Sequence, residues 1–170
     1  MKQGAIRFVR LLVLTASLTG LIWWVSGSLS PYIRLGINAS DSLPGWVYWV
    51  KTGDKTSLQV GDTIGFYPPA NPYYPATFLF IKQVIGVAGD VVSFGETYPT
   101  GTDFYINGQR MGMAKAVTQG GQALQHSQPG RISPGFVFVW TPHPDSFDSR
   151  YALVGLVPVT QVVGRAQRVF

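Results

Sequence analysis

The sequence contains no cysteine and few charged side chains. Without cysteine the chain can form no disulfide framework, no cysteine-ligated zinc site, no iron–sulfur cluster and no thiol nucleophile. Charged residues make up 12% of the chain, about half the usual share, and hydrophobic residues make up 46%, so disorder driven by charge is excluded. The two histidines, His126 and His143, are too few for most metal sites built from histidine. We therefore expect no metal and no other cofactor.

Glutamate is also nearly absent, because Glu96 is the only one among 170 residues, whereas glycine (20) and proline (12) are frequent. Few helix formers and many chain-reversing residues argue against an all-helical protein. The length suits one domain of ordinary size with an appendage.

The net charge of +5 is concentrated at the N-terminus. Lys2, Arg7 and Arg10 carry three of these charges, and the remaining +2 is spread along the chain without a basic run. Nucleic-acid binding needs a clustered basic patch that follows the phosphate backbone. We therefore expect no nucleic-acid partner.

An uncharged, mostly apolar segment covers residues 11–33. A helix of about 20 residues crosses the bilayer core of roughly 30 Å. Trp23 and Trp24 stand near its far end, where indole rings favour the membrane interface, and the preceding basic residues favour a cytoplasmic N-terminus. The sequence predicts a cytoplasmic stub and transmembrane anchor over residues 1–30 and an extracytoplasmic domain over residues 31–170. A cleaved secretory signal is the alternative, because Val25 and Gly27 could flank a cleavage site.

Beyond residue 31 the pattern is typical of β structure. Short apolar runs are separated by Gly-Asp, Asn-Gly and Pro-Gly turns, and we expect strands in DTIGFY, TFLFIKQVIGV, DVVSF, DFYING and GFVFVW. Asn107-Gly108 predicts a hairpin, since both residues tolerate positive φ. The proline-rich residues 67–75 predict a surface loop, and residues 112–134 a long excursion. The C-terminal residues 154–170 could add one or two strands, broken at Pro158.

Three polar features stand out in this domain: the turn around Ser42, the lone Lys82 in an apolar run, and the cluster over residues 145–150. Each alone fits an ordinary structural role: a hydrogen-bonded turn, an edge-strand lysine or a salt-bridged loop. Together they favour nucleophilic catalysis. A serine hydroxyl needs a base, and a lysine of ordinary pKa, about 10.4, is a base only when neutral. Burial in apolar surroundings, as around Lys82, lowers a lysine pKa by up to about 3–5 units.

These features, in this order, resemble the three motifs of the signal peptidase I superfamily, membrane-anchored serine peptidases with a Ser–Lys dyad. The matching segments are Ser40-Asp41-Ser42 with Pro44, residues 82–90 (KQVIGVAGD), and Ser146-Phe147-Asp148-Ser149-Arg150. The resemblance implies a mainly β, signal-peptidase-like sheet or barrel catalytic domain behind one N-terminal transmembrane helix. It implies that Ser42 is the nucleophile and Lys82 the general base. The Ser42 amide and the Ser40 hydroxyl would form the oxyanion site, and the supporting residues would be Ser146, which orients the lysine amine, and the ion pair Asp148–Arg150.

Within the superfamily the chain is most similar to the TraF-type peptidases of conjugative transfer systems, through Ser42-Leu43-Pro44 followed by Gly45 and Tyr48. Two departures are that Gly45 directly follows Pro44 and that Thr141-Pro142-His143-Pro144 replaces the usual Gly-Asp-Asn before the third motif. The resemblance implies a serine endopeptidase of the bacterial inner (cytoplasmic) membrane whose catalytic domain lies on the periplasmic side. Its polypeptide substrate would be a propilin or a similar exported precursor. The acyl-enzyme would then be resolved by water, or by an amine, in which case the product is cyclised through a new peptide bond.

Two other functions stay open at this point. One is a general type I signal peptidase that removes leader peptides from many preproteins. The other is a non-catalytic, membrane-anchored β module of a secretion or conjugation apparatus; an intact Ser42 and Lys82 argue against it.

Overall fold

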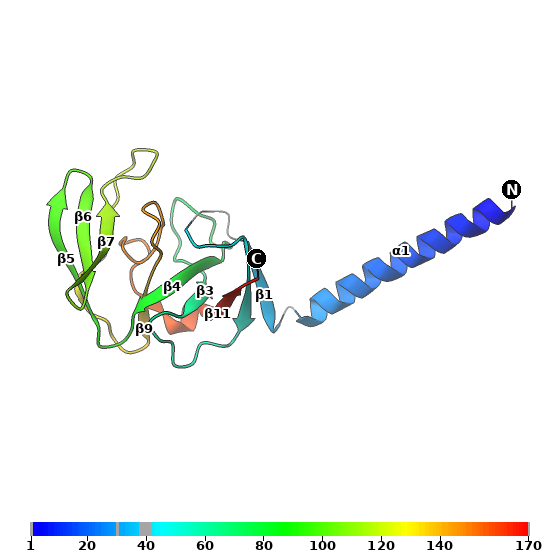
Figure 1. Ribbon diagram of the computed structural model, residues 1–170, viewed down its shortest axis with the longest axis horizontal. Coiled ribbons are helices and arrows are strands. Elements are labelled where there is room, and N and C mark those ends of the chain that lie inside the picture. The colour runs from blue at the N-terminus through cyan, green and yellow to red at the C-terminus, as the bar shows by residue number, and fades with distance from the viewer. Residues whose placement is uncertain (1, 30, 38–41, 170) are drawn as a thin grey trace. The chain divides into compact units, whose positions relative to one another are not determined.

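The computed structural model describes residues 2–29, 31–37 and 42–169, and the chain divides into two compact units, Met1–Arg34 and Leu35–Phe170 (Figure 1). The first unit is built on the 28-residue helix α1 (Lys2–Leu29). Its segment Ile6–Ser28 has 23 residues and a mean hydropathy of 1.8. At 1.5 Å per residue this segment spans about 35 Å, compared with a bilayer core of about 30 Å. The helix is therefore long and apolar enough for a membrane anchor or for a signal sequence.

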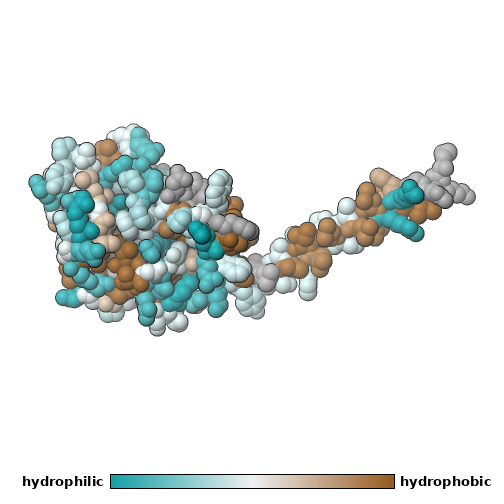
Figure 2. Space-filling view, in the orientation of Figure 1, coloured by the Kyte–Doolittle hydropathy of each residue, from teal (hydrophilic) through white to brown (hydrophobic). Residues whose placement is uncertain are grey.

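The side chains of α1 suit apolar surroundings. Figure 2 shows apolar groups exposed along the helix, and Trp23 and Trp24 are 83% and 69% exposed. The hydroxyl groups of Thr15, Thr19 and Ser28 each donate to the carbonyl oxygen four residues earlier, at 3.0, 2.8 and 2.9 Å. Each donor is thus paired inside its own helix, as a lipid environment requires.

The second unit consists of two β-sheets (Figure 1). One sheet has the strand order β1-β2-β11-β3-β4-β9-β10, and its neighbours run antiparallel from β2 to β10. Its strands are β1 (Ile33–Ile37), β2 (Val47–Thr52), β3 (Thr63–Phe66), β4 (Phe80–Gly86), β9 (Phe136–Trp140), β10 (Val157–Pro158) and β11 (Val162–Arg168), with the short 3-10 helix η1 (Val159–Gln161) before the last. The other sheet has the order β7-β6-β5-β8, formed by β5 (Val91–Tyr98), β6 (Gly101–Ile106), β7 (Gln109–Lys115) and β8 (Gly130–Arg131).

The predicted mainly β fold behind one apolar helix is confirmed. Asn107 and Gly108 join β6 to β7 with φ of 51° and 80°, so the predicted hairpin turn forms. Gly61 and Gly89 have φ of 101° and 99° in the turns that lead into β3 and β5. Positive φ costs glycine little, and these turns therefore fix where the two strands begin.

Two parts of the fold differ from the prediction. Strands β1 and β2 were not expected, although β2 alternates clearly: Tyr48 and Val50 are buried, whereas Trp49 and Lys51 are exposed. The predicted excursion over residues 112–134 is also too long, because residues 112–115 belong to β7 and Gly130–Arg131 forms β8. A bulge lets β7 continue past its glycine, since the register with β6 shifts by one residue between Phe104 and Tyr105.

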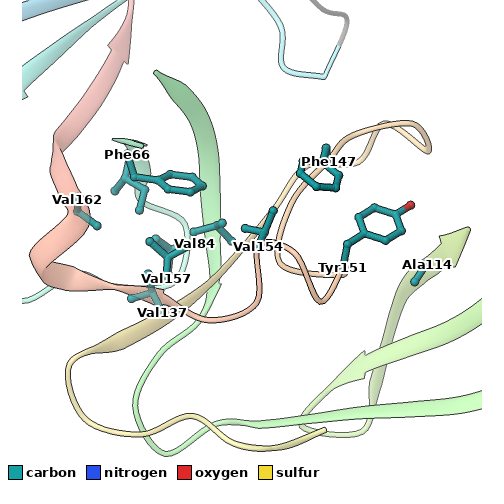
Figure 3. Packing of buried hydrophobic residues seen from close by; sticks show 11 residues of the cluster. Phe66, Val84, Ala114, Val137, Phe147, Tyr151, Val154, Val157 and Val162 are labelled. Atoms are coloured by element: carbon teal, nitrogen blue, oxygen red, sulfur yellow. The ribbon is translucent and has the colours of Figure 1, made fainter. Parts of the chain in front are cut away.

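The largest hydrophobic cluster joins the seven-stranded sheet to the segment that follows β9 (Figure 3). The sheet contributes the buried side chains Ile64, Phe66, Val84, Val137, Val139, Val157 and Val162. Phe147, Tyr151 and Val154 come from the segment after β9. Burying one large apolar side chain contributes about 1.5–3 kcal/mol. Because Phe147 and Tyr151 flank the polar residues 148–150, their burial carries the third polar motif into the domain next to β4.

Candidate active site

Lys82 lies on β4, in the interior of the seven-stranded sheet between β3 and β9. Its backbone pairs with Ile64 of β3, and its side chain is buried with 6% exposure. The alternative of an edge-strand lysine that reaches for water is therefore wrong. Strand β4 is buried on both faces, which is what its nearly continuous apolar run indicates.

The Lys82 amine contacts a hydroxyl group and an aromatic ring. Its Nζ donates a hydrogen bond of 2.7 Å to the Oγ of Ser146, and it lies 5.7 Å from the centre of the Phe80 ring. Burial lowers the pKa of Lys82 from 10.5 to about 8, against the opposing effect of the Asp148 carboxylate and with a smaller contribution from Arg150. Burial dominates because the charged form loses its hydration while the nearest partner, the Ser146 hydroxyl, is neutral.

Asp148 and Arg150 form an ion pair inside the domain, with side-chain exposures of 0% and 2%. The Asp148 Oδ1 and Oδ2 accept hydrogen bonds from Nε and Nη2 of Arg150, both at 2.9 Å. The guanidinium also donates to the carbonyl oxygens of Met113, His143 and Ser146, at 3.1, 3.1 and 2.9 Å. Arg150 thus ties the segment that carries Ser146 to strand β7, and it satisfies its own donors in doing so.

Ser42 is buried with 6% exposure and lines the same cleft as Lys82 and Ser146. The turn that follows it is held in two ways. Gly45 has φ of 100°, which a side chain would strain. The Tyr48 hydroxyl at the start of β2 donates to the carbonyl oxygen of Pro44. Ser40, the predicted second oxyanion donor, lies outside the described residues.

The cleft has a volume of about 660 Å³. It is lined by the buried polar residues Ser42, Lys82 and Ser146, by apolar side chains such as Phe78 and Phe80, and by polar side chains such as Gln119 and Asp145. His143 also lines it, and its Nδ1 accepts a hydrogen bond of 3.2 Å from the backbone amide of Asp145. Within the described ranges, His, Asp and Glu side chains form no group of three that could hold a metal ion.

Several cleft residues were not singled out from the sequence. Tyr73 and Tyr74 come from the proline-rich loop before β4, and the doubled tyrosine was its only signal. Lys115 of β7 forms an ion pair with Asp145, which also accepts a hydrogen bond of 3.0 Å from Gln119. These contacts join segments about 30 positions apart, so no local sequence pattern predicts them.

The chain belongs to the signal peptidase family, peptidase S26, whose family model matches residues 5–170. The family is one of peptidases, and the predicted membership is confirmed. The conjugal transfer protein TraF of Agrobacterium fabrum is 25% identical over 189 residues, which cover 99% of this chain and 97% of that protein. Among solved structures, a signal peptidase I from Enterococcus faecalis is 22% identical, with a TM-score of 0.39 over 65% of this chain and 97% of that one.

Proposed function

We propose that the chain is a membrane-anchored serine endopeptidase that uses Ser42 and Lys82 as a catalytic dyad on exported precursors of a conjugative transfer system. The observation that carries the proposal is the buried Lys82 amine, which is held by the Ser146 hydroxyl in a cleft that Ser42 also lines. Membership of a peptidase family supports the reaction type, and similarity to a conjugal transfer protein supports the setting.

The dyad would act through the neutral form of the lysine. Lys82 takes the proton of the Ser42 hydroxyl while Oγ attacks the carbonyl carbon of the scissile bond. When the C–N bond breaks, the Lys82 ammonium returns that proton to the leaving amine, and the acyl group stays on Ser42 as an ester. With a pKa of about 8, Lys82 is neutral in about one molecule in ten at pH 7. A lysine of ordinary pKa would be neutral in about one molecule in two thousand.

The other motif residues would support this chemistry. The Ser42 amide and the Ser40 hydroxyl are the proposed donors to the oxyanion, and loss of one such donor typically costs about 2.7–4 kcal/mol in the barrier. Ser146 orients the lysine amine. Asp148 and Arg150 hold the segment of Ser146 in place through their ion pair and the hydrogen bond from Arg150 to the Ser146 carbonyl oxygen.

Three exposed apolar side chains of the cleft support an extended peptide with apolar side chains as the substrate. Ile37, Phe78 and Val117 line it and are 77%, 51% and 47% exposed, which is high for large apolar side chains. A bound peptide would remove this surface from water, and each buried Å² contributes about 25 cal/mol. A propilin or similar precursor fits this requirement, and so does the leader peptide of a general type I signal peptidase.

The helix supports an anchored topology. Residues 1–30 would form a cytoplasmic stub and a single span, and residues 31–170 the periplasmic peptidase domain, because Lys2, Arg7 and Arg10 precede the span. Protease added outside spheroplasts should then digest the domain and leave a cytoplasmic tag intact. A domain that survives while a periplasmic marker is digested contradicts this topology.

The function is tested by mass spectrometry of the transfer pilin and other exported precursors from cells with the native chain, the Ser42→Ala chain or neither. We expect a shortened pilin only with the native chain. A linear product and a head-to-tail cyclic product differ by the mass of one water, so the same spectra identify the acceptor. Equal processing in all three strains contradicts the proposed function, and loss of processing across many preproteins would favour a general signal peptidase.

A further inference from the structure

The proline-rich loop between β3 and β4 is held in a defined conformation. Residues 67–75 contain four prolines, and each fixes its own φ. The Asn71 Oδ1 accepts hydrogen bonds from the backbone amides of Tyr73 and Tyr74 at 3.0 and 2.9 Å, and its Nδ2 donates to the Pro69 carbonyl at 2.9 Å. The prolines also restrict the unfolded loop, so ordering its backbone costs little conformational entropy. The loop therefore holds Tyr74 in a defined position.

Tyr74 contacts two aromatic rings of the cleft, Phe80 and Phe147. Its ring centre lies 5.2 Å from that of Phe80, nearly perpendicular at 89°, and 5.6 Å from that of Phe147. Phe80 is the ring that the Lys82 Nζ approaches, at 5.7 Å. Phe147 directly follows Ser146, whose hydroxyl accepts the lysine hydrogen bond. Tyr74 thus packs on the ring beside the amine and on the ring of the residue that follows Ser146, and it lines the cleft itself.

We propose that Tyr74 is a positioning residue of the active site, whose ring packs on Phe147, holds Phe80 against the amine of Lys82 and keeps water from that amine. The inference rests on the function proposed above for Lys82. It gives the proline-rich loop a role in the reaction, although the loop carries no reacting group.

Burial is the effect that Tyr74 would control. It is the largest cause of the lowered pKa of Lys82, ahead of the charges of Asp148 and Arg150. The other titratable side chains that face the cleft are Tyr73, Lys115, His143, Asp145 and Tyr151. Replacing Tyr74 leaves all of these titratable groups in place. A change in the pKa of Lys82 would therefore report hydration of its amine rather than the loss of a neighbouring charge.

Three variants distinguish the effect of the Tyr74 ring on the pKa of Lys82 from the effect of its hydroxyl group and from the effect of losing any half-exposed tyrosine. In Tyr74→Ala we expect the pKa of Lys82 to rise by about one unit, which lowers the neutral fraction at pH 7 about tenfold. Tyr74→Phe keeps the ring and should keep the pKa. Tyr98→Ala is the control, because Tyr98 lies on β5 of the other sheet and has the same exposure as Tyr74, 38%.

The experiment is an NMR titration of the full chain in detergent micelles with 15N-labelled lysine, with the Lys82 signal assigned by its loss in Lys82→Met. A rise in Tyr74→Ala alone supports the inference, and an unchanged pKa in a folded Tyr74→Ala overturns it while leaving the dyad intact. If Tyr74→Ala does not fold, Asn71→Ala, which removes the hydrogen bonds that place the ring, must raise the pKa, and no rise there overturns the inference. A native Lys82 that titrates near its ordinary value overturns both this inference and the neutral-lysine mechanism.

Discussion

The Nζ of Lys82 on β4 donates a 2.7 Å hydrogen bond to the Oγ of Ser146, which lies 64 positions further along the chain. The partner is a hydroxyl group and not a carboxylate. A hydroxyl oxygen accepts from an ammonium and from an amine, so it fixes the direction of the side chain while stabilising the charged form less than a carboxylate would. Burial can then lower the pKa of Lys82 to about 8, although Asp148 acts in the opposite direction.

The first prediction tests this neutral partner. Ser146→Asp would place a carboxylate within hydrogen-bond reach of the amine and raise the pKa of Lys82 by about 1–3 units. Peptidase activity at neutral pH should fall by the same factor of about ten to a thousand and partly recover as the pH rises. Ser127→Ala is the control, since Ser127 is also buried and its hydroxyl has no hydrogen-bond partner among the described residues. Equal activity of Ser146→Asp and the native chain at pH 7 would exclude this role for Ser146.

The second prediction concerns the dyad as a unit. Ser42→Ala and Lys82→Ala should each abolish processing, and the double variant should be no worse than either single one, because the nucleophile and the base act in the same step. Ser40→Ala should keep residual activity, since the Ser42 amide remains as an oxyanion donor. Turnover of a peptide spanning the precursor cleavage site measures all four variants. Full activity of Lys82→Ala would direct attention to His143 as the base.

The third prediction follows from the sign of the pKa shift. Between about pH 8 and 10.5 the unfolded chain binds more protons at Lys82 than the folded chain does, so native stability rises with pH across this window. Lowering the pKa of Lys82 from 10.5 to about 8 corresponds to about 3 kcal/mol of native stability. Lys82→Met should therefore be more stable than the native chain at pH 7 by up to about 3 kcal/mol, less the lost hydrogen bond to Ser146 of about 1 kcal/mol.

Urea unfolding of the native and Lys82→Met chains in detergent micelles measures this difference in stability. The other ionisable groups are the same in both chains, so their contributions cancel in the difference between the two free energies of unfolding. The advantage of Lys82→Met should shrink as the pH rises and be lost above the ordinary lysine pKa. A difference that does not change with pH contradicts a buried lysine of lowered pKa.

Much of the lining of the candidate site could be predicted from local sequence, because its motifs are short and continuous. An apolar run around a single lysine indicates a strand buried on both faces, and β4 has that form. Asn107-Gly108 encodes its own turn through its φ preferences. The contacts of Tyr74 with Phe147 could not be predicted in this way, since they join segments 73 positions apart through the packing of a loop on the core. Strand β2 could not be predicted from alternation, because residues 47–50 are all apolar or aromatic and only their burial alternates.

The fourth prediction concerns the buried ion pair. Arg150→Met would leave the Asp148 carboxylate buried without its cation, which typically costs about 3–5 kcal/mol of stability. Lys51→Gln is the control, because Lys51 pairs with Asp54 at 3.8 Å with side chains that are 75% and 30% exposed, and exposed pairs contribute about 0–1 kcal/mol. The midpoints of urea unfolding measure both variants. Similar losses in the two would contradict a structural role for the Asp148–Arg150 pair.

The central claim is that a neutral Lys82 activates Ser42, and the rate at which a serine-reactive acylating probe labels Ser42 tests it most directly. The rate should be followed against pH in the native and Lys82→Arg chains, with the labelled residue located by mass spectrometry. The native rate should rise along a limb near pH 8, the pKa of Lys82, with the label on Ser42. Lys82→Arg should not be labelled, because a guanidinium stays protonated throughout this range. Labelling of Lys82→Arg at the native rate, or a native limb that stays near the ordinary lysine pKa, would contradict the account.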